Sequence, residues 1–193
     1  LWSDASSIAS REGTQRGLLR YVKKLGNPVA QRAADGTLNL YYVTVSLGGW
    51  AGSSITVITS KDDGATWGAA RRLITSPFIN ISTLVKGTPY SYSDGSIGLP
   101  VYHEFIGKFG ELLRINNSGE IIDKQRLSSG NTTLQPVMLM QNPLQATVMM
   151  RSPSGMKLDS TLSSVVLPEP VPPEMMMFLR CSTARCMNSA MSG

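Results

Sequence analysis

Tyr102, His103 and Glu104 stand side by side at the end of an apolar run. A phenol, an imidazole and a carboxylate in one place can carry proton-transfer chemistry, and we predict that Glu104 and His103 are catalytic. Glu104 could act as a general base, or it could pair with Lys108 on a solvated loop. His103 could orient a substrate or move a proton near neutral pH, or it could be an ordinary hydrogen-bonding residue.

Three further side chains could bind a sugar. Arg151 ends an apolar run over 147–150, and a guanidinium there could grip a carboxylate with two parallel hydrogen bonds. Arg114 could be that partner instead, or it could lie on the surface of an outer strand. Trp50, in a Gly-Gly-Trp segment, could stack on a sugar face or fill the rim of a channel.

Short strands separated by turn signals would position these residues. Asp-Gly or Ser-Gly pairs stand between runs rich in Val, Ile, Leu, Tyr and Thr, which predicts hairpins in series. The pairs lie at 35–36, 63–64, 94–95 and 118–119. The expected strands run over 28–32, 38–46, 54–59 and 71–74, then 83–86, 97–104, 111–116 and 121–127, then 136–140 and 146–151, after which the pattern fades.

The strand groups repeat. Asn27, Asn80 and Gln135 each enter the first strand of one group, at intervals of 53 and 55 residues. Four-stranded units at this spacing are typical of propeller blades, which lack a sufficient core until they stack on neighbours. A β-sandwich is the alternative. We predict an all-β partial propeller over 27–157, with two and a half to three blades at 27–78, 79–133 and an incomplete 134–157.

Strand alternation locates a candidate site. Successive hairpins of an up-and-down blade point to opposite ends, so the connections between second and third strands share an end with the crossovers between blades. That end is predicted to gather Asn27, Asn80, Trp50, His103, Glu104 and Arg151. Propeller ligands bind at such a mouth of the central channel, so we predict that Asn27, Asn80, Trp50 and Arg151 contact substrate.

The segment Ser60-Lys-Asp-Asp-Gly-Ala-Thr-Trp67 matches every position of the Asp-box motif Ser-x-Asp-x-Gly-x-Thr-Trp. Gly64 allows the positive φ of a tight turn, and the Asp62 carboxylate can accept hydrogen bonds from turn amides. The hydroxyls of Ser60 and Thr66 add local bonds, and the Trp67 ring covers the hairpin. We predict a structural role for this motif and no catalytic role for Asp62.

From about residue 20 to 151 the chain resembles the bacterial sialidase/neuraminidase-like family with BNR repeats. Besides the Asp box, the resemblance rests on Gly26-Asn-Pro28, Gly48-Gly-Trp50, Ser76-Pro-Phe-Ile-Asn80, Asp94-Gly-Ser-Ile97, Leu99-Pro-Val-Tyr-His-Glu104 and Leu134-Gln-Pro136. It implies a six-bladed β-propeller whose full members hydrolyse, or at least bind, terminal sialic acids or related acidic sugars. It also implies that Glu104 could polarise a tyrosine nucleophile, as a glutamate does in sialidases.

The sialidase mechanism also needs an arginine triad and an acid/base aspartate, and this set cannot be assembled from the sequence. No Phe-Arg-Ile-Pro phrase is present. We therefore expect either a fragment of an exo-sialidase-type glycoside hydrolase or a chain that has lost activity. A non-catalytic propeller that binds a glycan or a protein is the alternative function.

The composition of the chain limits the classes of partner and ligand that we expect for it. Among 193 residues, 18 Lys and Arg against 13 Asp and Glu give a formal net charge of +5, but the cations are scattered, which predicts no nucleic-acid partner. No run approaches the roughly 20 apolar residues of a membrane span. Cys181 and Cys186 lie far from His103, the one histidine, so we expect no metal and no cofactor. The resemblance to proteins that act on external glycans favours an extracytoplasmic or secreted location.

The N-terminal end departs from the strand pattern. Ser10 is placed to cap a helix, and Leu18, Leu19, Val22 and Leu25 follow at helical spacing. This predicts a helix over about 10–24 within a lead-in over 1–26.

The C-terminal stretch over 158–193 is rich in Pro and Met, a composition that forbids central strands. We hypothesise that the reading frame is lost near Lys157, and an Asp-box phrase in another frame of the gene would support this. A divergent native tail that is disordered or wraps the open edge is the alternative. An incomplete propeller exposes strand edges and apolar blade faces, so we also predict self-association.

Overall fold

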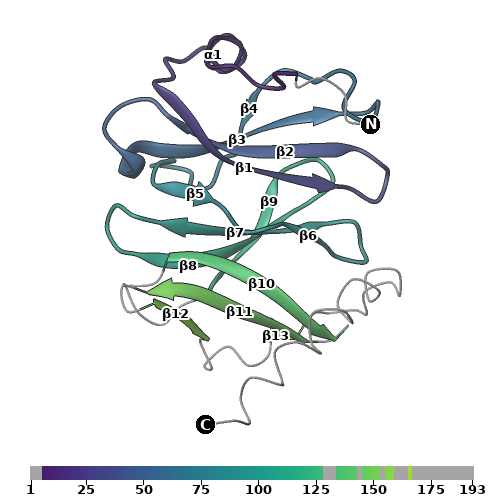
Figure 1. Cartoon of the computed structure of the whole chain (residues 1–193), viewed down its shortest axis with the longest axis vertical. Helices are drawn as coiled ribbons and strands as arrows, with labels where there is room; N and C mark the ends of the chain where they lie inside the picture. Colours follow the sequence, from purple (N-terminus) through teal and green to yellow (C-terminus); the bar gives the residue numbers. More distant parts are fainter. Residues whose placement is uncertain (1–5, 128–133, 143–144, 153–154, 159–164, 167–193) are drawn as a thin grey trace.

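A computed structural model describes residues 6–127, 134–142, 145–152, 155–158 and 165–166. The fold is mostly β, with one α-helix, α1 (Arg11–Leu18), and three antiparallel sheets stacked one on the next (Figure 1). Sheet 1 contains β1 (Lys24–Arg32), β2 (Leu38–Val45), β3 (Ser53–Ser60) and β4 (Arg71–Arg72). Sheet 2 contains β5 (Thr83–Val85), β6 (Tyr90–Ser91), β7 (Ile97–His103), β8 (Phe109–Ile115) and β9 (Ile121–Arg126). Sheet 3 contains β10 (Leu134–Asn142), β11 (Gln145–Ser152), β12 (Gly155–Leu158) and β13 (Val165–Val166).

Apart from β6 and β13, the strands pair in chain order within each sheet, as the hairpin pattern predicts. Sheet 1 has the order β1-β2-β3-β4, and sheet 2 repeats it as β5-β7-β8-β9. Three short strands depart from the expected set: β6, which pairs with β7, β12, which pairs with β11, and β13, which pairs with the start of β11. The connections between β2 and β3 and between β7 and β8 lie at one end of the stack, on the left in Figure 1. We call this the mouth end, and the other the Asp-box end.

Proline and glycine explain why the first strand of sheet 2 is split into β5 and β6. Pro100, within β7, has no N–H to give to a neighbouring strand, and β5 pairs with β7 on one side of it while β6 pairs on the other. The chain between them bulges toward sheet 3 at Gly87. A Cβ at Gly87 would collide with the carbonyl oxygen of Pro136 in β10, so only glycine allows this approach of the two sheets.

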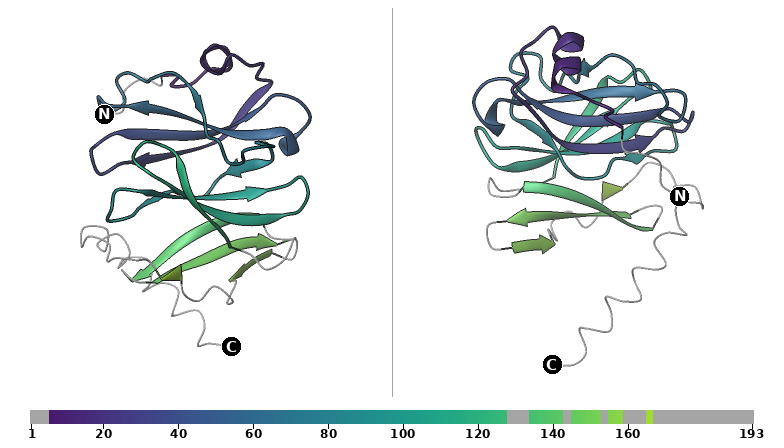
Figure 2. Two further views of the ribbon diagram at one scale, coloured as in Figure 1. Left: turned by 180° about the vertical axis from the view of Figure 1, so that it is seen from behind. Right: turned by 45° about the horizontal axis from the view of Figure 1, so that its top comes forward.

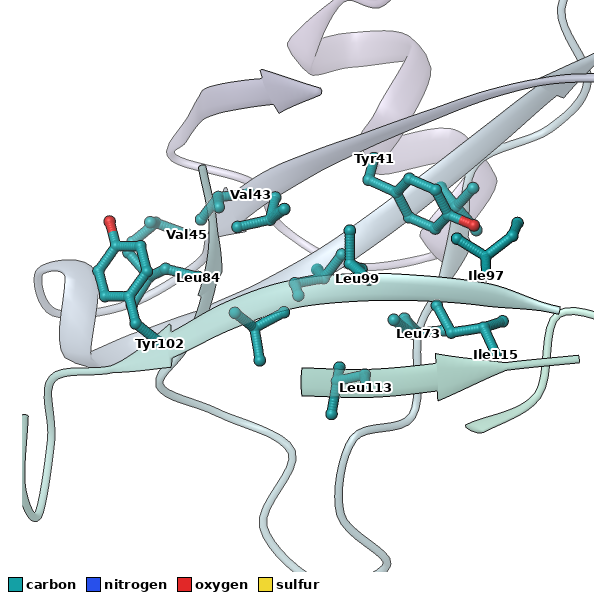
Figure 3. Close-up of a cluster of buried hydrophobic side chains, with 14 residues drawn as sticks. Tyr41, Val43, Val45, Leu73, Leu84, Ile97, Leu99, Tyr102, Leu113 and Ile115 are labelled. Atoms are coloured by element: carbon teal, nitrogen blue, oxygen red, sulfur yellow. The ribbon is translucent and has the colours of Figure 1, made fainter. Parts of the chain in front are cut away.

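The hydrophobic core lies between the facing sheets rather than within one of them. Sheet 1 contributes Tyr41, Val43, Val45, Ile55, Val57 and Leu73, and sheet 2 contributes Leu84, Val85, Ile97, Leu99, Val101, Tyr102, Leu113 and Ile115 (Figure 3). The inner strand β7 is buried along six of its seven residues, whereas the outer strand β9 is exposed along most of its length. Asp123, Lys124 and Arg126 on that outer strand suit an edge that must not pair with other chains.

The N-terminal helix is shorter than predicted. Ser10 caps it as expected, since the Ser10 hydroxyl accepts a hydrogen bond from the Gly13 amide at 3.0 Å. The helix ends at Leu18, because Leu19 adopts a left-handed conformation with φ of 50°. The chain then joins sheet 1: Val22 is fully buried, and the amide of Lys23 donates to the Val45 carbonyl. The helical spacing over 10–24 was therefore misleading, because Leu19 is 93% exposed and Val22 packs beside a strand.

The Asp-box motif forms the turn between β3 and β4. The Asp62 carboxylate accepts hydrogen bonds from the Ser60 hydroxyl at 2.7 Å, the Thr66 amide at 2.9 Å and the Thr66 hydroxyl at 2.5 Å. The Ser60 hydroxyl accepts from the Gly64 amide, and the Trp67 indole donates to the Gly64 carbonyl at 3.1 Å. Gly64 has a φ of 91°, which a residue with a side chain adopts only with strain. The turn is therefore closed by its own side chains.

Most of the predicted tail falls outside the described residues. Within 158–193 only Leu158, Val165 and Val166 are described, as parts of β12 and β13. The predictions of a lost reading frame, a disordered tail and the domain boundary at 157 remain predictions.

We predict that Asp62→Asn destabilises the protein at neutral pH and that the difference disappears in acid. The Thr66 hydroxyl and amide and the Ser60 hydroxyl lower the pKa of Asp62 from 3.8 to about 2. A carboxyl whose folded-state pKa is depressed stabilises the fold above its unfolded pKa and loses that effect as pH falls through the folded value. Urea unfolding of both proteins between pH 2 and 6 measures this. Equal midpoints at pH 6 would contradict it, and Asp123→Asn is the control.

Candidate functional site

Tyr102 is the point at which the three sheets meet at the mouth end. The residue is 3% exposed and belongs to the core between sheets 1 and 2 (Figure 3). Its hydroxyl accepts a hydrogen bond from the Asn27 amide at 3.3 Å, and it also interacts with the side chain of Gln135 in sheet 3. The Lys86 ammonium in turn donates to Gln135 Oε1 at 3.3 Å. One buried phenol thus connects polar side chains from sheets 1, 2 and 3.

The electrostatics of Tyr102 keep it protonated. Burial raises the pKa of Tyr102, and the nearby charge of Glu104 raises it further, while the hydrogen bonds to Asn27 and Gln135 act in the opposite direction. The net shift is upward, so the hydroxyl is a neutral donor and acceptor at physiological pH. The effect of the Glu104 charge on Tyr102 also means that the Glu104 carboxylate lies near the Tyr102 phenol.

Three residues in left-handed backbone conformation mark equivalent places in the three sheets. Asn27, Ser82 and Gln135 have φ of 47°, 66° and 54°, and they precede or enter the first strands of sheets 1, 2 and 3. Strand pairing is interrupted by a bulge that contains Asn27 in sheet 1 and by another that contains Gln135 in sheet 3. Bulges re-aim side chains at the rims of sheets. The residue of sheet 2 that is equivalent to Asn27 and Gln135 is therefore Ser82. The sequence spacing had instead indicated Asn80.

Asn80 uses its side chain inside the connection between β4 and β5. Its Oδ1 accepts hydrogen bonds from the Thr75 amide at 3.0 Å and the Thr75 hydroxyl at 2.5 Å, and its Nδ2 donates to the Leu73 carbonyl at 2.9 Å. All of these partners lie within the same loop. The structure does not bring Asn80 together with Asn27, and its predicted contact with substrate remains a prediction.

Ser82 holds the loop that carries Glu104. The buried Ser82 hydroxyl accepts hydrogen bonds from the Glu104 amide at 3.0 Å and the Phe105 amide at 2.8 Å. The loop after β7 is thereby fixed to the start of sheet 2. Ser82 was not predicted from the sequence because a lone serine has no distinguishing signal, although its spacing from Asn27 and Gln135 is as regular as that of Asn80.

His103 pairs with the carboxylate of Glu111, which was not predicted from the sequence. The His103 ring stacks on Phe109, the residue opposite it in the β7–β8 hairpin, at 4.5 Å between centroids. Its Nε2 lies 2.7 Å from Oε2 of Glu111, two residues further along β8. Burial alone would raise the pKa of Glu111, but the hydrogen bond and charge of His103, together with Lys124 and Arg126, outweigh it and lower the pKa. Glu111 could have been found from the sequence only by placing it across the β7–β8 hairpin.

Trp50 and Arg151 lie at the same end. Trp50 opens the short 3-10 helix η1 (Trp50–Gly52), and the Lys24 ammonium lies 4.0 Å from its ring centroid. A Cβ at Gly26 would stand 2.8 Å from Trp50, so the ring packs closely on the backbone there. This packing favours the rim-filling interpretation of Trp50. Arg151 pairs with Leu134 in the β10–β11 hairpin, beside Gln135, and its side chain lies outside the described part of the chain.

Arg114 belongs to the Asp-box end. Its guanidinium donates to Asp94 Oδ2 at 2.6 Å and to the Ser96 hydroxyl at 2.9 Å, and it lies over the Tyr92 ring. These contacts support the interpretation that Arg114 lies on the surface of an outer strand, and not that it binds a sugar carboxylate.

Among the described residues, no group of three or more His, Cys, Asp or Glu could hold a metal ion, and no helix is long and apolar enough to cross a membrane.

The model of the BNR repeat-like domain family matches residues 1–165. The chain belongs to this family. The sequence resemblance to BNR-repeat, sialidase-like proteins is therefore confirmed. No curated protein matches the chain.

Solved structures show the same type of fold. Hadza microbial sialidase Hz136 superposes with a TM-score of 0.54 at 14% identity, over 74% of this chain and 34% of that one. A protein of unknown function from Dyadobacter fermentans DSM 18053 superposes with a TM-score of 0.53 at 15% identity, over 66% of this chain and 44% of that one. The BNR-repeat chain thus spans less than half the length of either neighbour, and at such identities the likeness concerns the fold alone.

We predict that Ser82→Ala loosens the loop that carries Glu104. Removing the hydroxyl leaves the amides of Glu104 and Phe105 without their acceptor, and one lost hydrogen bond corresponds to roughly 0.5–1.5 kcal/mol, or up to about tenfold in local opening. Hydrogen exchange at these two amides should be faster by that factor. Ser76→Ala, in the β4–β5 connection, is the control. Unchanged exchange in Ser82→Ala would show that other contacts hold the loop.

Proposed function

We propose that this BNR-repeat chain belongs to an exo-sialidase-type glycoside hydrolase that acts on terminal sialic acid or a related acidic sugar at the mouth end of a six-bladed propeller. The observation that carries the proposal is the convergence of Asn27, Gln135 and Glu104 on the buried Tyr102. Side chains from three sheets meet there, and catalytic groups of closed repeat folds are assembled in this way from separate units.

Glu104 has the best geometry for a chemical role. It follows a strand whose first six residues are buried, its amide is fixed by Ser82, and Glu104 itself is partly exposed. A fixed carboxylate at a solvent-accessible rim can act as a general base or can polarise a nucleophile. Tyr102 is not assigned the part of nucleophile, because it is 3% exposed and two amide side chains bind its hydroxyl.

His103 and Arg151 complete the proposed site. His103, held by Glu111 at 2.7 Å, would orient the substrate or carry a proton, since the carboxylate fixes the ring. Arg151 would bind the sugar carboxylate with paired N–H donors, and its backbone stands next to Gln135 in the β10–β11 hairpin. Asn27 would contact the sugar from sheet 1, and Trp50, packed on Gly26, would form the rim beside it.

A second function has support from the same loop. Phe105 and Ile106, directly after Glu104, are 59% and 90% exposed. Apolar side chains held out into solvent beside a polar rim are typical of binding surfaces. The alternative is therefore a non-catalytic propeller that binds a glycan or a protein partner at the mouth end.

Hydrolysis of a fluorogenic sialic acid glycoside by the chain and by Glu104→Gln tests the two functions. As a general base, Glu104 is expected to contribute roughly 10²–10⁴-fold to the rate, and the substitution should remove that factor. Glu120→Gln, in the β8–β9 turn at the Asp-box end, should leave the rate unchanged. A rate that is equal in Glu104→Gln would exclude Glu104 as a catalytic residue, and no hydrolysis by any variant would favour the binding module.

We also propose self-association of the chain through its exposed apolar surface. Phe78, Phe105 and Ile106, from the two connections at the mouth end, are each more than half exposed. We expect the chain to elute from size-exclusion chromatography above its monomer mass of 20.8 kDa. The double substitution of Phe105 and Ile106 by Ser should shift it toward monomer. A sharp monomer peak of the unsubstituted chain would refute the proposal.

A further inference from the structure

A cavity of about 450 Å³ opens between sheets 1 and 2 at the Asp-box end, away from the mouth end. This volume falls in the range of roughly 300–1,000 Å³ typical of small-molecule sites. Its floor is apolar and is formed by side chains such as Val57 and Ile97. Its wall is polar, and the side chains there that could contact a ligand are Asn39, Tyr41, Lys61, Arg71 and Asn117.

The cavity exists because sheets 1 and 2 are in contact toward the mouth end and are farther apart at the Asp-box end. Val43, Leu84 and Leu99 are at most 1% exposed and pack between the two sheets in the middle of the stack (Figure 3). Further along, the facing positions carry Asn39 and Thr59 in sheet 1 and Gly95 in sheet 2, which leave the space open. Figure 2 shows the hairpins of the two sheets at this end from behind. Arg71 bridges the gap by donating to the Gly119 carbonyl at 3.2 Å.

Tyr41 is the unusual residue of this cavity. It is 3% exposed, and its hydroxyl points toward Ile97, which also lines the cavity (Figure 3). The other buried tyrosine hydroxyls have partners: Tyr42 pairs with Thr14, Tyr90 with Tyr92 and Tyr102 with Asn27. Within the described residues, no hydrogen bond reaches the Tyr41 hydroxyl. Among the described residues, the one buried side-chain nitrogen or oxygen without a hydrogen-bond partner is Arg72 Nε, so the Tyr41 hydroxyl is open to solvent in the cavity and can donate to a ligand oxygen in place of water.

The charges of the wall favour an anion. Burial raises the pKa of Tyr41 to about 12, against the opposing charge of Arg71, so the phenol is a neutral hydrogen-bond donor. Arg71 uses one N–H group on Gly119 and retains others, and Lys61 adds a second cation. The one carboxylate of the lining, Asp35, accepts the Thr37 amide at 3.0 Å within its own turn.

We propose that this cavity binds a hydroxylated carboxylate of mono- to disaccharide size, a sugar acid. Arg71 pairs with the carboxylate, and Tyr41 donates to one of the ligand's oxygens. Asn39 and Asn117 bind its hydroxyl groups, and the apolar floor at Val57 and Ile97 receives the C–H face of the ring. This site is separate from the proposed catalytic site at the mouth end and stands on different residues.

Isothermal titration calorimetry of the whole chain with D-glucuronate tests the proposal, with D-glucose and inorganic phosphate as comparison ligands. We expect saturable binding of glucuronate, weaker binding of glucose, which lacks the carboxylate, and weaker binding of phosphate, which lacks the ring. Tyr41→Phe should weaken glucuronate binding about tenfold, which corresponds to roughly 1.4 kcal/mol. Arg71→Gln should weaken it at least as much.

Two controls separate this site from others and from loss of fold. Tyr21→Phe alters an exposed tyrosine elsewhere, and Glu104→Gln alters the mouth end; both should bind glucuronate normally. Thermal unfolding verifies that each variant is folded, and Arg71→Lys replaces Arg71→Gln if the latter is not. Absence of saturable glucuronate binding, equal affinity in Tyr41→Phe, or phosphate bound as tightly as glucuronate would each overturn the proposal. Loss of binding in Glu104→Gln would place the ligand at the mouth end instead and would also overturn it.

Discussion

The structure depends on the packing of one sheet against the next. A four-stranded sheet with two apolar faces has no core of its own, so Val43, Ile55 and Leu99 become buried only when sheets 1 and 2 meet. At roughly 1.5–3 kcal/mol for each fully buried aliphatic side chain, this interface is the main stabilising contribution that the described residues make between sheets. The connections at the two ends of the stack add little to this interface, so their sequences can differ without loss of the packing between sheets. The mouth end and the Asp-box end can therefore carry different chemistry on the same stack.

Local sequence patterns predicted those elements of the fold that are determined by residues close together in the chain. Asp-Gly turns and apolar runs placed the strands from β1 to β11, apart from the unpredicted β6, close to their observed positions. The Asp-box phrase predicted its own hydrogen bonds, because this motif is closed within a few residues. The helix over 10–24 was predicted too long, since the periodicity of Leu18, Leu19 and Val22 cannot distinguish a helix from a strand extension paired through Lys23. The blade count of the whole propeller remains a prediction.

The candidate site was less accessible to sequence reasoning, because it depends on contacts between distant residues. The direction of alternating hairpins placed Asn27, His103 and Glu104 at one end, but no sequence rule reveals that Tyr102 joins Asn27 to Gln135. Glu111 is found only by pairing across the hairpin. The cavity beside Tyr41 could not be predicted at all, since it results from where two sheets cease to be in contact, and its unpartnered hydroxyl is a property of the assembled pair.

The left-handed residues at Asn27, Ser82 and Gln135 have a consequence for how such a fold can diversify. Their backbone geometry is the same, but their side chains differ in length and polarity: a short amide, a hydroxyl and a longer amide. Asn27 and Gln135 reach the Tyr102 hydroxyl, and Ser82 reaches the loop after β7, so exchanging one of these side chains for another alters the contacts at the mouth end while the strands behind keep their pairing. A duplicated unit with this construction can acquire a new specificity by single replacements, one unit at a time, while its scaffold stays intact.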